Sequence, residues 1–302
     1  MAAGSVCEAH GGVLDGRAIR SCPCAGNEGS LSARLSMKKP WPLMSFLLML
    51  ILVGCSQPRK KQVHLFVPCG MLIPLQSLKP HFTEQTGLEV DYFFENADNL
   101  LKQIRRGARP DVLITPGVVE MKQMLEEGYI IPESVRVFGT YKLALIVPAR
   151  NKAGIESVED LAKPSVKQIA IADPEQNSVG YYAREALKNL GLWASVQDKI
   201  VDHRHAVEAV KYVLYEMVDA GIYYSACPFQ SAPEKLENRS DFYRFIADIP
   251  PEAYPKVKIQ AGLLKEAKHP QAGKQFIEFL LTPEAQRILA EKGLPNYEEQ
   301  GL

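Results

Sequence analysis

Short β-rich runs alternate with longer helical patterns from residue 63 onward, and this alternation limits the fold more than any other feature. Apolar and β-branched runs predict strands at residues 63–67, 89–94, 111–115, 143–148, 168–172 and 220–224. Between these runs, apolar residues recur at helical spacing. Such an alternation predicts an α/β fold in which mostly parallel sheets are flanked by helices.

Several of the predicted helices have recognisable ends. Asp98 is expected to be the N-cap of the helix that follows it, with Gly107 just past the end of that helix. Apolar residues at 206–217 predict another helix before the last of the predicted strands. Thr282 and Pro283 predict a capped helix start near the C-terminus, because proline is favoured in the first turn.

The segment that ends at Cys55 has the layout of an export signal. Lys38 and Lys39 precede an unbroken apolar run at 46–53, which is followed by Gly54 and Cys55. The run is too short to span a bilayer comfortably, so residues 37–54 are predicted to be a cleaved bacterial lipoprotein signal peptide. Lipid on Cys55 would tether the extracytoplasmic protein to a bacterial membrane. A permanent membrane anchor or a buried core helix is the alternative.

Residues 1–36 lack apolar periodicity and are rich in Gly, Ala and Ser. They are predicted to be a non-native or disordered extension, because a signal peptide should begin near Met37. The alternative is a genuine extension in which Cys22 and Cys24 form a metal site.

Removal of the signal would leave about 240 residues, enough for two lobes that each have a core. We expect a linker at 55–62, a first lobe at 63–139 plus 253–302, and a second lobe at 140–252. Two crossing segments would make a hinge with a cleft beside it. The chain has 35 basic and 35 acidic residues without a basic stripe, so nucleic acid is not an expected partner.

From about residue 63 to 295, the chain resembles the periplasmic molybdate-binding proteins of ABC importers, which belong to the two-lobed extracellular solute-binding proteins. The stretches that carry the resemblance are 82–87, 110–114, 141–148, 171–175, 180–187, 219–224 and 282–286. The resemblance implies a type II periplasmic-binding-protein fold with a two-strand hinge. It also implies a monomer that binds molybdate or tungstate, without a cofactor, and passes it to an ABC permease and its ATPase.

The resemblance further implies that neutral donors hold the oxyanion: serine hydroxyls, backbone N–H groups at helix N-termini and a tyrosine hydroxyl. The matching positions in this chain are Cys69, Gly70, Ala97, Asp98, Ser178, Val179, His205, Ala206 and Tyr224. Gly70 stands where relatives have a serine, and neither Ala97 nor Asp98 has a hydroxyl group. A charge-assisted hydrogen bond contributes roughly 1.5–3 kcal/mol, so losing two would weaken binding unless backbone groups replace them.

These departures raise a second hypothesis, in which Cys69, His205 and Cys227 bind copper or zinc, with His203 and Asp98 as additional ligands. Against it, the two cysteines could be buried or could form a disulfide. A third hypothesis is a secreted thiol or metal-dependent enzyme that uses Cys69 with His205. The sequence has no nucleophile elbow, P-loop or zinc-protease pattern, so we expect a binding protein without catalytic residues.

Overall fold

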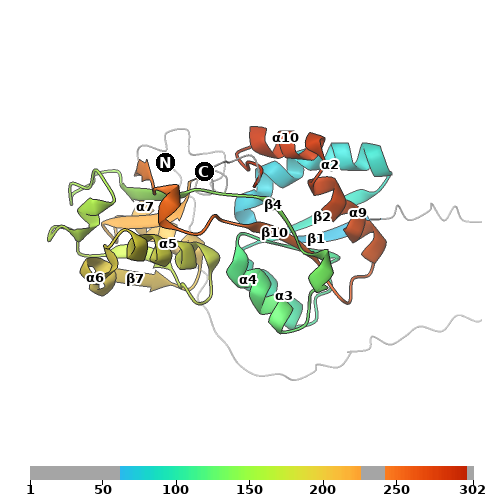
Figure 1. The fold of residues 1–302 in the computed structure, drawn as a ribbon, viewed down its shortest axis with the longest axis horizontal. Coiled ribbons are helices and arrows are strands. Elements are labelled where there is room, and N and C mark those ends of the chain that lie inside the picture. The colour runs from blue at the N-terminus through green and yellow to red at the C-terminus, as the bar shows by residue number, and fades with distance from the viewer. Residues whose placement is uncertain (1–61, 226–241, 298–302) are drawn as a thin grey trace, which may run out of the picture. The chain divides into compact units, whose positions relative to one another are not determined.

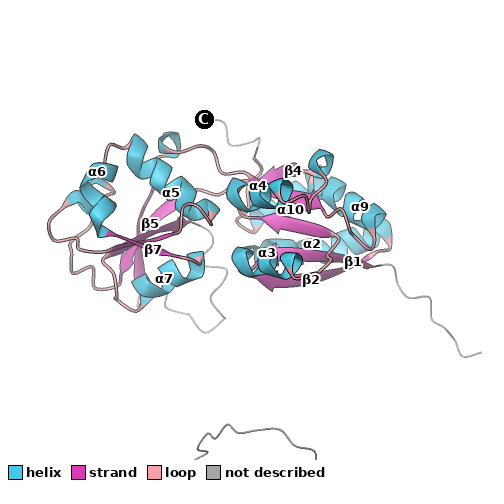
Figure 2. Cartoon of the chain, turned by 90° about the horizontal axis from the view of Figure 1, so that it is seen from below, coloured by secondary structure: helices cyan, strands magenta, loops and turns pink. Residues whose placement is uncertain are grey.

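The computed structural model describes residues 62–225 and 242–297, which form two five-stranded sheets flanked by helices (Figure 1). We call each sheet with its helices a lobe. Figure 2 shows the strands of each lobe packed among helices. Both lobes belong to one unit of the chain, 58–302. The predicted α/β, two-lobed fold is confirmed. In the described part of the chain, no helix is both long enough and apolar enough to cross a membrane.

The first lobe contains a mixed sheet with the strand order β2-β1-β3-β10-β4. Its strands are β1 (Gln62–Pro68), β2 (Glu89–Glu95), β3 (Val112–Thr115), β4 (Arg136–Gly139) and β10 (Ile259–Leu263). β1 is parallel to β2 and β3, whereas β10 is antiparallel to β3 and β4. The chain therefore returns late to the first sheet, as the orange-red strand β10 in Figure 1 shows.

Helices cover both faces of this first sheet. They are η1 (Cys69–Met71), α2 (Leu72–Thr86), α3 (Ala97–Arg105), α4 (Val118–Glu126), η2 (Pro132–Ser134), α9 (Pro270–Leu280) and α10 (Pro283–Glu291). Alternate side chains of β1 point to opposite faces of the sheet, as the pleat requires. Leu65 joins the core that contains Phe82 of α2 and Phe276 of α9, whereas Phe66 packs on the core that contains Leu100 of α3. The apolar alternation in β1 thus places a helix layer on each side.

The second lobe contains a mixed sheet with the order β7-β6-β8-β5-β9. Its strands are β5 (Leu143–Pro148), β6 (Ile169–Ala172), β7 (Ile200–His203), β8 (Ala220–Tyr224) and β9 (Tyr243–Asp248). β6 is parallel to β7 and β8, while β5 is antiparallel to β8 and β9. The accompanying helices are η3 (Glu159–Ala162), α5 (Ser178–Asn189), α6 (Trp193–Val196), η4 (Gln197–Lys199), α7 (Ala206–Leu214) and η6 (Pro251–Ala253).

All the strands predicted from the sequence are present, with ends that differ by at most about one residue. The strands that the prediction missed are β4, β7, β9 and β10. β4, β7 and β9 lie at sheet edges, where polar side chains face water and the apolar signal is weak. β10 carries Gln260 and Gly262, which lower its strand propensity. Because β5 and β10 run antiparallel to their neighbours, each sheet is mixed.

Two helix predictions need correction. Asp98 is not the N-cap of α3; Asn96 is, since its Oδ1 accepts a hydrogen bond from the Asn99 N–H at 2.9 Å. Asp and Asn are equally good caps, so only the extended backbone at Asn96 decides between them. The helix predicted to reach residue 217 ends at Leu214.

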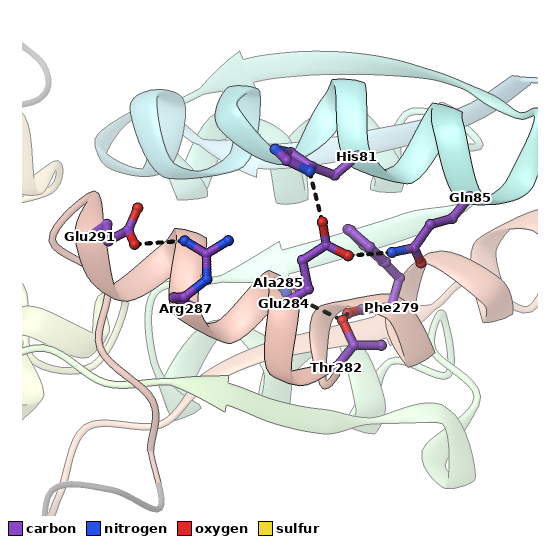
Figure 3. Close-up of polar contacts among 8 residues, drawn as sticks. All are labelled: His81, Gln85, Phe279, Thr282, Glu284, Ala285, Arg287 and Glu291. Carbon is purple, nitrogen blue, oxygen red and sulfur yellow. Dashed lines mark hydrogen bonds and ion pairs between the residues drawn. The ribbon is translucent and has the colours of Figure 1, made fainter.

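The capped start of α10 is confirmed, and it joins a polar contact with α2. Thr282 Oγ1 accepts a hydrogen bond from the Ala285 N–H at 3.3 Å. Glu284, in the first turn, lies 2.8 Å from His81 Nδ1 through its Oε1 atom, and its Oε2 atom accepts a hydrogen bond from Gln85 (Figure 3). This contact fixes the C-terminal helix against the first lobe's early helix.

Candidate functional site

A small pocket, partly open to solvent, lies where strands of both lobes end and helices begin. Its lining residues are Pro68, Cys69, Gly70, Asn96, Ala97, Pro116, Asn177, Val179, His205, Ala206, Val207, Tyr223 and Tyr224. β1, β3 and β8 end beside it, and α3, α5 and α7 start there. Ligands of α/β proteins bind at the carboxyl ends of strands, so the topology marks this pocket as the candidate binding site.

The helix starts make the pocket suited to an anion. The first N–H groups of a helix have no intrahelical acceptor, and the helix dipole places partial positive charge there. Asn96 caps α3 and Asn177 caps α5, each through a side-chain oxygen that accepts from one N–H group. Among the described residues that line the pocket, none is Lys, Arg, Asp or Glu. The pocket therefore offers neutral donors rather than full charges.

Most residues singled out from the sequence meet at this pocket. The predicted site residues in its lining are Cys69, Gly70, Ala97, Val179, His205, Ala206 and Tyr224. Ser178 and Asp98 adjoin it in the chain but are not among the lining residues. The sequence did not point to Asn96 or Asn177, although an Asn just before a helix pattern is a capping signal that could have identified both.

Tyr224 connects the two lobes at the pocket. Its hydroxyl donates a hydrogen bond to the carbonyl oxygen of Pro116 at 2.9 Å, and its ring packs against Tyr141 at a centroid distance of 5.3 Å. Pro116 directly follows β3 of the first lobe, whereas Tyr224 ends β8 of the second. Because the hydroxyl hydrogen of Tyr224 is donated to Pro116, the phenol oxygen can only accept hydrogen bonds from other groups.

Ser178 is fully buried and its hydroxyl faces Glu120 of α4. The Ser178 N–H donates to Glu120 Oε1 at 3.0 Å, and its Oγ donates to Glu120 Oε2. The same Oγ accepts a hydrogen bond from the Val119 N–H at 2.9 Å. Burial raises the pKa of the Glu120 carboxyl. Sequence analysis missed Glu120 because a single acidic residue on an amphipathic helix carries no functional signal.

Asp98 forms a second polar connection between the lobes. Its Oδ2 atom lies 3.5 Å from Nδ1 of His205 and 3.7 Å from Nε of Arg204, and it also pairs with Lys102 in α3. The carboxylate is largely buried, and the cations Lys102 and Arg204 compensate a charge that would otherwise be costly. Cationic neighbours also weaken the repulsion that Asp98 would exert on an anion in the pocket.

The residues of the metal hypothesis do not assemble in the described part of the chain. Among residues 62–225 and 242–297, no group of three His, Cys, Asp or Glu side chains is placed to hold a metal ion. Cys69 and His205 both line the pocket, but Cys227 lies outside the described residues. His203 is buried at the end of β7, with its ring 4.1 Å from that of Tyr212, and burial lowers its pKa.

Comparisons with known proteins agree with this architecture. The chain is 29% identical over 196 residues to the putative ABC transporter substrate-binding lipoprotein YvgL of Bacillus subtilis, which covers 64% of this chain and 70% of YvgL. It is 28% identical to the molybdate-binding protein ModA of Rhodobacter capsulatus, covering 73% of this chain and 82% of the relative.

A solved structure supports the fold. The periplasmic molybdate-binding protein of Azotobacter vinelandii superposes with a TM-score of 0.58 at 21% identity, covering 77% of this chain and 98% of the other. Residues 63–294 match the family described as bacterial extracellular solute-binding protein. That span includes both sheets, except for the first residue of β1, and every residue that lines the pocket. The protein is therefore not an enzyme, and it belongs to the bacterial extracellular solute-binding protein family.

Proposed function

We propose that this protein captures a small oxyanion, molybdate or tungstate, in the pocket between its lobes and delivers it to an ABC permease and its ATPase. One observation carries the proposal: three helix N-termini and no formally charged Asp, Glu, Lys or Arg side chain surround the pocket in the described chain. Such a site stabilises an anion through oriented N–H dipoles. The relatives named as molybdate-binding proteins support this choice of ligand.

The proposed contacts come from both lobes. Backbone N–H groups near Gly70 and Ala97 would act from the first lobe, and those at Ala206 from the second. The Val179 N–H, which donates to Asn177 Oδ1 at 3.2 Å, would exchange that cap for the anion. Tyr224 would hold the lobes together beside the anion through its hydrogen bond to Pro116. Because only the closed form makes both sets of contacts, ligand binding would select that form. The hinge would separate a first lobe at 63–139 plus 253–302 from a second lobe at 140–252.

The missing serine hydroxyls alter what this site would recognise. Gly70, Ala97 and Asp98 replace hydroxyl donors with backbone N–H groups alone, and the Ser178 hydroxyl is engaged by Glu120. Affinity would then depend on helix-end geometry rather than on side-chain donors.

We further propose that residues 37–54 are a signal peptide and that Cys55 carries lipid, with 1–36 outside the mature protein and 55–62 as its linker. The lipoprotein YvgL supports the anchor. Apart from Gln62, which begins β1, these residues lie outside the described part of the chain. The tethered protein would act as a monomer on the extracytoplasmic side.

Titration calorimetry on the full-length chain tests the function. Sodium molybdate and sodium tungstate are titrated in turn, with sulfate and phosphate as comparison anions. We expect saturable binding of molybdate or tungstate and a higher midpoint of thermal unfolding in its presence, because a ligand that binds only the native state stabilises it. Heat from sulfate or phosphate alone would assign the pocket to another oxyanion and overturn the proposal.

A further inference from the structure

Glu120 and Ser178 form a capping box that is divided between the two lobes. In an ordinary capping box, the serine and the glutamate belong to the first turn of one helix and satisfy each other's backbone N–H groups. Here Ser178 begins α5 of the second lobe, while Val119 and Glu120 lie in the first turn of α4 of the first lobe. Each helix therefore receives a side-chain acceptor from the opposite lobe, which in α5 adds to its own cap at Asn177.

The hydrogen bonds are reciprocal. Ser178 Oγ accepts from the Val119 N–H at 2.9 Å, which satisfies one of the orphan donors of α4. The Glu120 carboxylate accepts from both the N–H and the hydroxyl of Ser178, the former at 3.0 Å. The first N–H group of α5 thereby gains an acceptor. Gly117, the N-cap of α4, has no capping side chain, so the serine of the other lobe supplies the missing cap.

The contact is tight and excludes water. Both Glu120 and Ser178 have no exposed surface. A Cβ atom at Gly117 would lie 2.3 Å from the Ser178 Cβ, so the close approach of the two lobes requires glycine at that position. Tyr182 of α5 also packs against Gly117. A carboxylate that is buried in this contact needs hydrogen-bond donors, and Ser178 of the other lobe supplies them. The lobes therefore cannot separate without breaking these hydrogen bonds.

Every atom in this contact belongs to the protein. We propose that Glu120 and Ser178 form an interlobe latch that stabilises the closed arrangement independently of ligand, and that the latch must break when the pocket opens. The closed arrangement then has an intrinsic population that a ligand increases further. The role of the latch in releasing solute rests on the proposed function, whereas the latch itself does not.

The latch also divides the N-terminus of α5 between two tasks. The N–H group and hydroxyl of Ser178 serve Glu120, while Val179, the next residue, lines the pocket. A protein carboxylate thus takes up part of the positive end of α5. Loss of the latch would free Ser178 donors for a bound anion while making closure less favourable, so the two effects on affinity oppose each other. For this reason the test uses no ligand.

Energy transfer between two fluorophores on the full-length protein measures closure directly. The dyes are placed by unnatural amino acids at Lys79 of α2 and Gln197 of η4, both exposed and on different lobes. We expect the protein with Glu120 and Ser178 unchanged to be mostly closed in ligand-free buffer, and so to show mainly high energy transfer. Ser178→Ala and Glu120→Ala should each raise the open-to-closed ratio by about 10- to 100-fold, the factor for loss of a charge-assisted hydrogen bond.

Glu126→Gln is the matched control, because Glu126 lies on α4 but is exposed and pairs only loosely with Lys122 at 3.7 Å. It should leave the transfer unchanged. A protein that is already mostly open with the latch intact, or latch variants that behave like the control, would overturn the proposal. Neither result depends on whether molybdate binds, so failure of the latch and failure of the proposed ligand are separate outcomes.

Amide hydrogen exchange provides a second measurement should Glu120→Ala fail to fold. Ser178→Ala retains the backbone and removes only the hydroxyl that accepts from Val119. Exchange at the Val119 and Ser178 amides should accelerate together, because both donate across the lobes. The Asn99 amide, which donates within the first lobe to Asn96, is the internal reference and should not change. Acceleration at Val119 alone would indicate a local cap without a latch and contradict the proposal.

Discussion

The hydroxyl of Tyr224 donates a hydrogen bond to the carbonyl oxygen of Pro116 at 2.9 Å, and so joins the end of β8 in the second lobe to the segment after β3 in the first. Both residues line the pocket. The tyrosine is therefore placed to connect occupancy of the pocket with the contact between lobes. Its phenol oxygen can still accept a hydrogen bond while the hydroxyl group donates to Pro116.

Replacing Tyr224 by Phe removes this hydroxyl and keeps the ring that packs on Tyr141. We expect the affinity for molybdate or tungstate to fall about fivefold, because the closed form loses the hydrogen bond to Pro116 and a net hydrogen bond contributes roughly 1 kcal/mol. The protein should remain folded, with its circular dichroism spectrum preserved. Calorimetric titration measures the affinity, and an unchanged dissociation constant would show that the Tyr224 hydroxyl has no role in binding.

Replacing Glu284 by Ala removes the contacts with both His81 and Gln85 that join α10 to α2 (Figure 3). Because the His81 and Glu284 side chains are each 38% exposed, water screens their interaction. We expect the free energy of unfolding to fall by about 1 kcal/mol, mainly through the lost hydrogen bonds. Glu291→Ala, whose partner Arg287 lies on the same helix, should cost roughly 0.3–0.5 kcal/mol in denaturant titrations. Equal losses would mean that α10 is not held by Glu284.

The buried Glu120 carboxyl predicts a pH dependence of stability. Burial raises its pKa above the ordinary value of 4.5 in the folded protein, and hydrogen bonds from Ser178 oppose this effect only in part. The folded state therefore binds the proton more tightly than the unfolded state. The stabilisation is complete below the unfolded pKa and is lost as the pH rises through the folded pKa. Tyr182 is the titratable group that interacts with the Glu120 charge, and burial raises the pKa of its hydroxyl, so it stays neutral throughout.

Comparison with Glu120→Gln isolates this effect. Denaturant titrations between about pH 4.5 and 8 should show the native protein gaining stability relative to Glu120→Gln as the pH falls. Asp160, Glu175 and Glu216 have lowered pKa values through their cationic or backbone partners and oppose this trend in the total stability. Their contribution is common to both proteins and cancels in the difference. A difference that is constant with pH, or that reverses in sign, would contradict a raised pKa at Glu120.

Cys55→Ser tests the proposed anchor in a bacterial host. Serine cannot form the thioether that carries the lipid, so the exported protein should move from the membrane fraction to the soluble extracytoplasmic fraction. Cys69→Ser is the matched control, since Cys69 lines the pocket and should have no part in anchoring. Immunoblots of separated fractions measure the distribution. Continued membrane retention of Cys55→Ser would refute lipid attachment at that cysteine.

Local patterns were sufficient for several helix ends and for the strands β1, β2, β3, β5, β6 and β8. β8 has the predicted bounds, because its buried apolar residues are consecutive and adjoin Asp219 before the strand. Gly107 follows α3 with a φ of 104°, a conformation that glycine adopts at low cost. The strands that were missed have polar or glycine residues within them, and their pairing partners are distant in the chain. Their hydrogen bonds are formed only when the sheet assembles.

The amino-acid sequence alone determined the α/β class and most of the strands, because apolar periodicity and helix-end residues act over a few neighbours. The predicted site residues came from the resemblance to a known family. Tertiary structure alone decided the roles of Asp98, Ser178 and Glu120. Asp98 and Asn96 are equivalent as potential caps, and only the folded backbone selects Asn96. The Glu120–Ser178 contact spans 58 positions of the chain, so no local pattern records it. It exists because two helix N-termini from different lobes meet, and buried N–H groups there require acceptors.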